Sequence, residues 1–301
     1  MNRDYQYQAK QVEAITIRPF LFDFPDGLDP KWVPSNIVRS HFFNGVSLTM
    51  PYLEPFLVKT MREAAGHLSE PELLEDIRAF NGQEASHYKC HRRLNTLLKT
   101  NGYPEFEEVE ARLDTAYKKL STRSLRTKLA YSAGFECMTN GFTTWLINKR
   151  QQLFAGASPH IASFWLMHMI EETEHKTVAF DVYMAYSGQY WPRAIGVFHG
   201  SFHVLHYGII GMFTALKKDG TLGELQCLAK IIRHFFSLLW NVGPFLFRAL
   251  LPWHNPRGEA DPEWMRQWVA GHAKLSADDR LPLVDTSDPE MPVPFTQQAP
   301  A

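Results

Sequence analysis

Two Glu-x-x-His pairs are the residues of this chain best suited to do chemistry together. The first pair is Glu84 with His87, and the second is Glu172 with His175. Residues three apart share one face of a helix, so each pair can offer a carboxylate and an imidazole to a single metal ion. With 13 His and 32 Asp plus Glu in 301 residues, about 1.4 such pairs are expected by chance. The pairs therefore need support from their surroundings.

That support comes from a single acid in an apolar stretch before each pair. Glu54 lies in Met50-Pro-Tyr-Leu-Glu-Pro-Phe-Leu, and Glu136 lies in Tyr131-Ser-Ala-Gly-Phe-Glu-Cys-Met. The order Glu, Glu-x-x-His, Glu, Glu-x-x-His along four helices is the ligand set of di-iron and di-manganese carboxylate proteins. It predicts two metal ions, iron first and manganese or zinc as alternatives. The competing interpretation, four surface glutamates, would place Glu54 and Glu136 in solvent beside large apolar neighbours.

His168 extends the second pair. It lies four residues before Glu172, so His168, Glu172 and His175 form one stripe along a helix. We predict that His168 is a third histidine ligand. The alternative is a partly buried histidine in the aromatic run Phe164–Met167.

Three further polar residues flank the predicted ligands. His91 lies four residues after His87, and we expect it at most to support a ligand without binding metal itself. Gln83 and Glu171 each adjoin a ligand and can hydrogen-bond to ligating groups, as metal-bound histidines usually require. Solvated surface positions are the alternative for Gln83 and Glu171.

Long helices are the elements that must position these residues. Apolar spacing and capping signals predict helices near 36–66, 69–101, 122–154 and 159–188, with a polar connection between the second and third. Pro51 and Pro55 are expected to kink or split the first helix. The predicted fold class is all-α: a ferritin-like four-helix bundle with a di-metal core and appended C-terminal helices.

The same pattern divides the chain into four parts. Residues 1–34 form a proline- and aromatic-rich extended arm, and 35–190 form the bundle. Residues 191–253 supply appended apolar helices that pack on the bundle. Residues 254–301 form a polar tail, ordered near 262–274 and disordered at its end.

Two strings carry a family resemblance. These are Phe80-Asn-Gly-Gln-Glu-Ala-Ser-His and His168-Met-Ile-Glu-Glu-Thr-Glu-His-Lys-Thr-Val-Ala-Phe-Asp-Val-Tyr. They resemble the bacterial family of predicted metal-dependent hydrolases, which is regarded as ferritin-like, over roughly 15–220. Leu53 stands where that family usually has glycine before the first-helix glutamate. The third-histidine spacing is also similar to that of the arylamine N-oxygenases.

The ligand set leads to a main functional prediction and two alternatives. The main prediction is a di-iron, oxygen-activating oxygenase or hydroxylase for an apolar or aromatic small molecule, with dioxygen as co-substrate and a redox partner. The first alternative is a metal-dependent hydrolase that uses a binuclear centre to activate water. The second is a non-catalytic metal-binding protein.

Charge and cysteine content limit the binding partners and the cellular location that we expect. The formal net charge of −1 gives no electrostatic footprint for nucleic acid. Three widely spaced cysteines support neither a disulfide framework nor a thiolate zinc site. The first twenty residues lack an apolar signal core, so a cytoplasmic location is expected. A homodimer is also considered.

The stretch Ala194–Leu216 contains no Lys, Arg, Asp or Glu. His199, His203 and His206 on one face make a membrane span unfavourable. We expect a buried helix that caps the bundle; the alternative is peripheral membrane contact, aided by the aromatic stretch Phe235–Trp253. The three histidines are interpreted as core residues, a proton relay or a second metal site.

Overall fold

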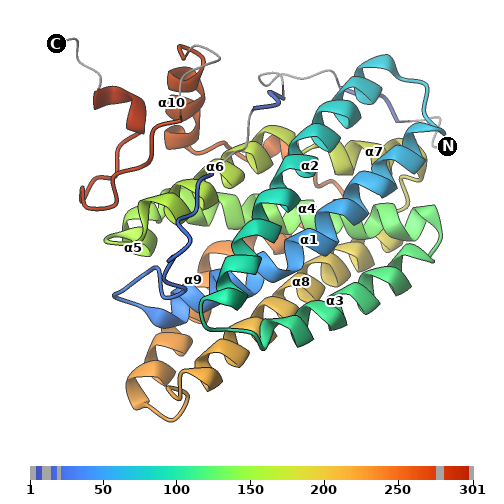
Figure 1. Ribbon diagram of the computed structural model, residues 1–301. Helices are drawn as coiled ribbons and strands as arrows, with labels where there is room; N and C mark the ends of the chain where they lie inside the picture. Colours follow the sequence, from blue (N-terminus) through green and yellow to red (C-terminus); the bar gives the residue numbers. More distant parts are fainter. Residues whose placement is uncertain (1–4, 9–14, 19–21, 276–280, 298–301) are drawn as a thin grey trace.

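The computed structural model describes residues 5–8, 15–18, 22–275 and 281–297 (Figure 1). All regular elements within these ranges are helical, which confirms the all-α prediction. Parts of the predicted arm and tail, at 1–4, 9–14, 19–21, 276–280 and 298–301, lie outside the described residues. No helix in the described part of the chain has the length and apolar character needed to cross a membrane.

Four helices surround the predicted ligands: α1 (Ile37–Ala65), α2 (Pro71–Thr100), α4 (Leu125–Asn148) and α6 (Pro159–His175). The Asn36 side chain caps α1, and the Ser124 side chain caps α4, by accepting a backbone N–H three residues on. Both α2 and α6 begin with proline, whose missing N–H is harmless in the first turn. Helix α1 packs on α2 and α4, and α6 packs on the same two helices, so the four enclose a common core.

Helix α1 runs unbroken through Pro51 and Pro55, so of the two predicted outcomes, a kink or a split, the split is wrong. A proline at position 51 cannot donate to the carbonyl of Ser47, four residues earlier. The Asn95 side chain of α2 donates to that carbonyl instead, at 3.0 Å. A neighbouring helix thus replaces the hydrogen bond that Pro51 removes.

Two other helix boundaries differ from the sequence expectation. The polar connection between the second and third predicted helices contains α3 (Phe106–Ser121), whose Val109, Leu113 and Tyr117 form a buried stripe. The fourth predicted helix is two helices, α6 and α7 (Val178–Tyr186). Lys176 lies at the break and donates to the Glu259 carbonyl at 2.6 Å and to Asp261 at 2.5 Å. The end of the third predicted helix is likewise a separate short helix, α5 (Arg150–Phe154).

Helices α8 (Tyr190–Lys218) and α9 (Leu225–Ala249) both pack on α1 and α4 (Figure 1). Helix α8 approaches the two so closely that backbones meet. A Cβ on Gly134 of α4 would lie 2.1 Å from the carbonyl carbon of Gly196, and one on Gly45 of α1 would lie 2.1 Å from the carbonyl oxygen of Gly208. Glycine is required at both contacts because any side chain would overlap the facing backbone.

The outer sides of α8 and α9 stay in solvent, so the expectation of a buried capping helix holds for one face of α8 only. Large apolar side chains here are 52–73% exposed. We call this surface the α8–α9 face; it is defined by Trp191, Ile195, Phe198, Ile232, Phe236 and Trp240. After α9 the described chain continues through α10 (Glu263–His272), which packs near α4.

Candidate metal centre

All seven predicted ligands come together between α1, α2, α4 and α6, and none is more than 3% exposed. Helix α1 supplies one of them, α2 two, α4 one and α6 three. In that helix order they are Glu54, Glu84, His87, Glu136, His168, Glu172 and His175. Because i, i+3 and i+4 positions share a helix face, each helix presents its polar residues inward as one group.

The donor atoms fall into overlapping groups, each within 4.8 Å, that could hold a metal ion. One group joins Glu84, Glu136, Glu172 and His175, and a second joins Glu54, Glu84 and His87. Glu84 belongs to both groups, and Glu172 belongs to the first and to a further group with His87 and His168. Carboxylates shared in this way are suited to bridge two neighbouring cations.

Three of the carboxylates are buried without hydrogen-bond donors. Both oxygens of Glu54, of Glu84 and of Glu136 lack a hydrogen-bond partner among the described residues. Burying a polar group without a partner costs several kcal/mol, and a bare charge costs far more. Together with Glu172, these residues carry four negative charges when ionised, which equals the charge of two divalent ions. The donor set therefore fits a pair of metal cations.

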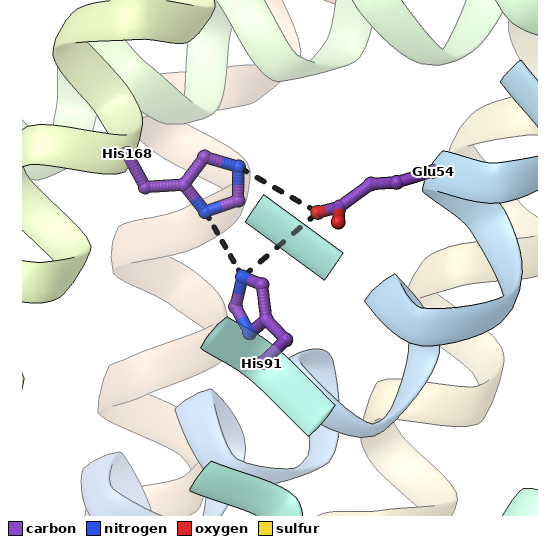
Figure 2. Close-up of side chains that lie close together, drawn as sticks. All are labelled: Glu54, His91 and His168. Carbon is purple, nitrogen blue, oxygen red and sulfur yellow. Dashed lines mark hydrogen bonds and ion pairs between the residues drawn. The ribbon is translucent and has the colours of Figure 1, made fainter. Parts of the chain in front are cut away.

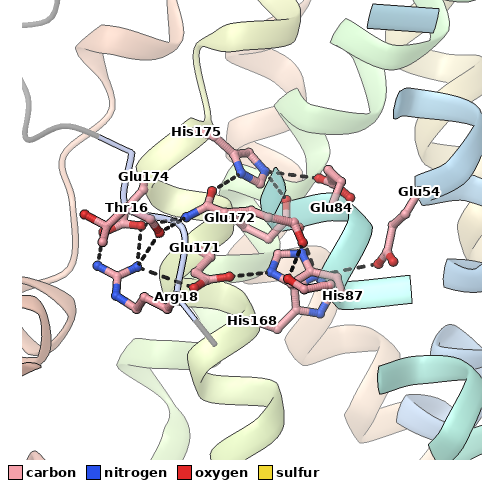
Figure 3. A network of polar contacts seen from close by, with 12 residues as sticks. Thr16, Arg18, Glu54, Glu84, His87, His168, Glu171, Glu172, Glu174 and His175 are labelled. Carbon is pink, nitrogen blue, oxygen red and sulfur yellow. Dashed lines mark hydrogen bonds and ion pairs between the residues drawn. The ribbon is translucent and has the colours of Figure 1, made fainter. Parts of the chain in front are cut away.

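The histidine of the second pair is oriented for a ligand. His175 Nδ1 lies 2.8 Å from Gln83 Oε1, and Gln83 Nε2 donates to Glu174 and to the Thr16 carbonyl. Those two bonds fix the amide, so its oxygen accepts from His175 Nδ1–H. His175 Nε2 is left facing Glu172 at 3.1 Å and Glu84 at 3.3 Å (Figure 3). A ring nitrogen placed between carboxylates is a position that suits a cation.

His87, the histidine of the first pair, is also oriented by a hydrogen bond on its outer side. His87 Nε2 lies 2.7 Å from Glu171 Oε2, so the ring donates outward. Its Nδ1 faces Glu172 Oε1 at 3.6 Å. Both contacts that the sequence suggested, from Gln83 and from Glu171, are therefore present, and each orients a histidine as metal centres commonly require.

His168 is oriented by a chain of hydrogen bonds that ends on α2. Ser47 Oγ donates to Asn95 Oδ1 at 2.7 Å and so accepts from His91 Nδ1 at 2.8 Å. His91 Nε2 is then free of hydrogen and accepts from His168 Nδ1 at 3.0 Å. This leaves His168 Nε2 directed toward the centre, 2.9 Å from Glu172. The same nitrogen lies 3.7 Å from Glu54 (Figure 2). Both ring nitrogens of His91 are hydrogen-bonded, one to Ser47 and one to His168, which agrees with the expectation that His91 supports a ligand and does not bind metal itself.

The pKa shifts of the buried groups reflect how closely negative charges are packed in this centre. Burial, followed by neighbouring carboxylates, raises the pKa of Glu84 and of Glu136 well above the usual range. Burial alone would lower the pKa of His87, but its hydrogen bonds with Glu171 and Glu172 raise that pKa to about 10. Burial and the nearby His87 lower the pKa of His168 to about 4. The site thus retains protons where cations would otherwise compensate the carboxylates.

Arg18 is a supporting residue that sequence reasoning missed. It is 4% exposed and binds Glu174 through two nitrogens at 2.6 Å each, with Glu171 at 3.5 Å (Figure 3). Glu171 contacts His87, and Glu174 contacts Gln83, so one guanidinium of the N-terminal arm supports both outer contacts. The only signal in the sequence was that Arg18 is the single charged residue of the stretch 14–22.

An apolar cavity of about 330 Å³ ends at the centre. His168 and Glu172 line its inner end, and Phe42 of α1 and Phe142 of α4 are among its side walls. Aliphatic and aromatic groups make up most of the remaining lining. The cavity places an apolar molecule beside two of the predicted ligands.

The histidines of α8 lie elsewhere. His203 Nδ1 lies 2.8 Å from the Tyr131 hydroxyl, which lies 2.8 Å from the Tyr117 hydroxyl. None of His199, His203 and His206 belongs to a group of described residues that could hold a metal ion. The interpretation as a second metal site is therefore wrong for the described part of the chain.

Fold and site together define an all-helical protein with an interior carboxylate–histidine cluster able to hold metal ions. The chain belongs to the family of predicted metal-dependent hydrolases, whose family model matches residues 16–260. No curated protein and no solved structure matches the chain.

Membership in this family corrects the main functional prediction. The family is described as hydrolytic, so the prediction of an oxygen-activating oxygenase is wrong and the hydrolase alternative is the better supported one. The error came from reading the reaction from the ligand set, which hydrolytic and oxidative two-metal sites share. The resemblance to N-oxygenases rested on the spacing of His168 alone, so it does not restore the oxygenase prediction.

Proposed function

We propose that this protein is a hydrolase whose interior centre holds two divalent metal ions within a ferritin-like arrangement of α1, α2, α4 and α6. The observation that carries the proposal is the set of six buried carboxylate oxygens without donors, faced by one ring nitrogen each of His87, His168 and His175. The proposed ligands are Glu54, Glu84, His87, Glu136, His168, Glu172 and His175.

The groups of donor atoms suggest how the ligands divide. Glu136 and His175 would hold one ion, and His87 with Glu54 would hold the other. Glu84 and Glu172 would lie between the two, since both share a group with Glu136 and His175 and each also shares a group with His87. His168 would join the ion on the His87 side. Nitrogen and oxygen donors without sulfur suit zinc, iron or manganese.

Metal ions in such a centre lower the pKa of bound water and polarise a carbonyl or phosphoryl group. In the net reaction, water forms a bond to the electrophilic atom, the bond to the leaving group breaks, and a proton from water ends on the leaving group. The chain contributes the cavity, which excludes bulk water from the inner end beside His168 and Glu172. Its apolar lining favours a substrate with an apolar body.

Metal analysis and hydrolysis assays test the proposal. Native protein should contain two metal ions per chain and hydrolyse members of a panel of carboxylic esters, amides and phosphoesters. Glu172→Ala should lose at least one ion and reduce hydrolysis by at least about 100-fold, because it removes a shared carboxylate. Glu110→Ala, a buried acid of α3 paired with Lys99, is the matched control and should keep both properties. Metal-free native protein, or hydrolysis unaffected by Glu172→Ala, would overturn the proposal.

A further inference from the structure

The α8–α9 face is an unusual surface for a protein exterior. Trp191 and Trp240 are each 73% exposed, and Phe236, which stacks on Trp240, is 66% exposed. The two helices run antiparallel, and their far ends are joined where Arg193 donates to the Ala249 and Leu251 carbonyls at 2.6 and 2.7 Å. Large apolar side chains exposed in this number along two adjacent helices indicate an interaction site.

The charge on the same helices is of one sign. Helices α8 and α9 contain six Lys and Arg and no Asp or Glu. Lys217, Lys230 and Arg233 form no ion pair with a described residue. A helix pair with aromatic and aliphatic side chains outward and uncompensated cations beside them has the chemistry of an interfacial anchor for anionic lipid.

The cavity that ends at the metal centre reaches this surface. Its outer lining includes Phe202 of α8 and Leu239 of α9, which are 58% and 71% exposed. Its inner lining includes His168 and Glu172, which are buried. The cavity therefore runs from between α8 and α9, past α1 and α4, to the proposed ligands.

We propose that the α8–α9 face docks on the surface of an anionic lipid bilayer, and that the substrate is a long-chain acyl ester that enters the cavity from the bilayer. The substrate half of this inference rests on the proposed hydrolase function; the docking half does not. The acyl chain occupies the apolar cavity, and the ester carbonyl lies at its inner end. Water adds its oxygen to the acyl carbon, the acyl–oxygen bond breaks, and the products are a carboxylic acid and an alcohol.

A bilayer accounts for the surface better than a second copy of the chain does. A partner protein packed on the face would cover the cavity entrance between Phe202 and Leu239, whereas a bilayer fills it with its own acyl chains. Interfacial tryptophan is also typical of the boundary between headgroups and hydrocarbon. Because no described helix is suited to cross a membrane, the protein would lie on the bilayer.

Vesicle co-sedimentation tests the docking half. Metal-loaded protein should sediment with vesicles of equal parts phosphatidylcholine and phosphatidylglycerol, and at least tenfold less with phosphatidylcholine alone. The double variant Phe236→Glu/Trp240→Glu should lose at least tenfold in vesicle binding while it retains its metal content. Leu283→Glu, at an apolar position 37% exposed outside the face, is the control and should bind like the parent. Arg233→Glu should remove about fivefold of the preference for anionic vesicles.

Ester hydrolysis, measured in vesicles and in solution, separates the docking half of the proposal from the substrate half. On a long-chain ester embedded in the anionic vesicles, the double variant should be at least tenfold slower than the parent, but on a short water-soluble ester the two should be equal. Neither Phe236 nor Trp240 lines the cavity, so the soluble reaction does not depend on them. Vesicle binding without hydrolysis of any carboxylic ester would overturn the substrate assignment, and absence of hydrolysis across the whole panel of esters, amides and phosphoesters would overturn the hydrolase proposal as well; both outcomes leave the docking intact. Hydrolysis of the soluble ester without vesicle binding would overturn the docking alone, as would a lipid-free dimer that the double variant dissociates.

Discussion

The metal centre and the α8–α9 face both depart from the usual distribution of side chains: the centre buries ionisable groups, and the face exposes apolar ones. The centre buries four carboxylates and three histidines at 3% exposure or less, whereas the face leaves large aromatic side chains more than half exposed. Folded proteins normally hold ionised groups at the surface and bulky apolar groups inside. Each region is therefore complete only with something that the chain does not contain: cations for the centre and an apolar phase for the face. The cavity between α8 and α9 connects the two.

Metal removal should give the largest effect and acts on the centre alone. Each ion at a thousandfold its dissociation constant stabilises the fold by about 4 kcal/mol, so two ions contribute about 8 kcal/mol. Chelation should lower the melting temperature by more than about 10 °C, because the carboxylates lose their counter-charge. Calorimetry with and without chelator measures this. An unchanged melting temperature would contradict the idea that the buried charges depend on metal.

Loss of Arg18 should be the next largest effect. Arg18→Met leaves Glu171 and Glu174 buried without their cation, and breaking a buried ion pair from one side costs about 3–5 kcal/mol. Urea unfolding measures the loss. Arg248→Met is the control, because its pair with Glu259 is half exposed and such pairs contribute less than about 1 kcal/mol. If Arg18→Met and Arg248→Met lowered the free energy of unfolding equally, burial would not be the reason that the Arg18 ion pairs stabilise the fold.

His91→Phe should weaken metal binding without abolishing it. The ring of His91 fixes the tautomer of His168, and loss of such an outer contact typically costs about 10–100-fold in metal affinity. Competition with a metal indicator at graded concentrations measures the affinity of both ions. Saturation at two ions in high metal would confirm a supporting role, and saturation at one would make His91 a ligand itself.

His234, on the buried side of α9, should make the stability of the fold sensitive to acid. Burial lowers its pKa to about 3, below the value near 6.5 of an unfolded chain, so the unfolded state binds the proton first as pH falls. Stability is then lost below pH 6.5, by about 1.4 kcal/mol per pH unit, or about 2 kcal/mol at pH 5. His234→Leu should remove this part of the acid sensitivity in urea unfolding at pH 7 and pH 5. His206→Leu, on the exposed side of α8, should behave like the parent; equal acid sensitivity of the His234 variant would refute the assignment.

Much of the centre could be predicted because helical spacing is local. Glu84 with His87, and His168 with Glu172 and His175, share a face through contacts within one helix, so the sequence alone places them together. Arg18 and Glu174 are 156 residues apart, and no pattern in either segment indicates the other. The continuity of α1 at Pro51 likewise depends on Asn95 from another helix. Helix α3 was missed because its polar residues outnumber a narrow apolar stripe.

The glycine contacts of α8 have a mechanical consequence for the cavity. At Gly134 and Gly45 the backbone of α8 rests directly on α4 and α1, and a backbone cannot yield by changing rotamer as a side chain can. Helix α9 meets the same two helices through side chains: His234 and Phe235 pack against Phe42 of α1, and His234 packs against Trp145 of α4. The two edges of the entrance therefore differ in stiffness. If the entrance widens to admit a bulky molecule, α9 is the edge whose side-chain contacts can yield, and α9 also carries the stacked pair Phe236 and Trp240.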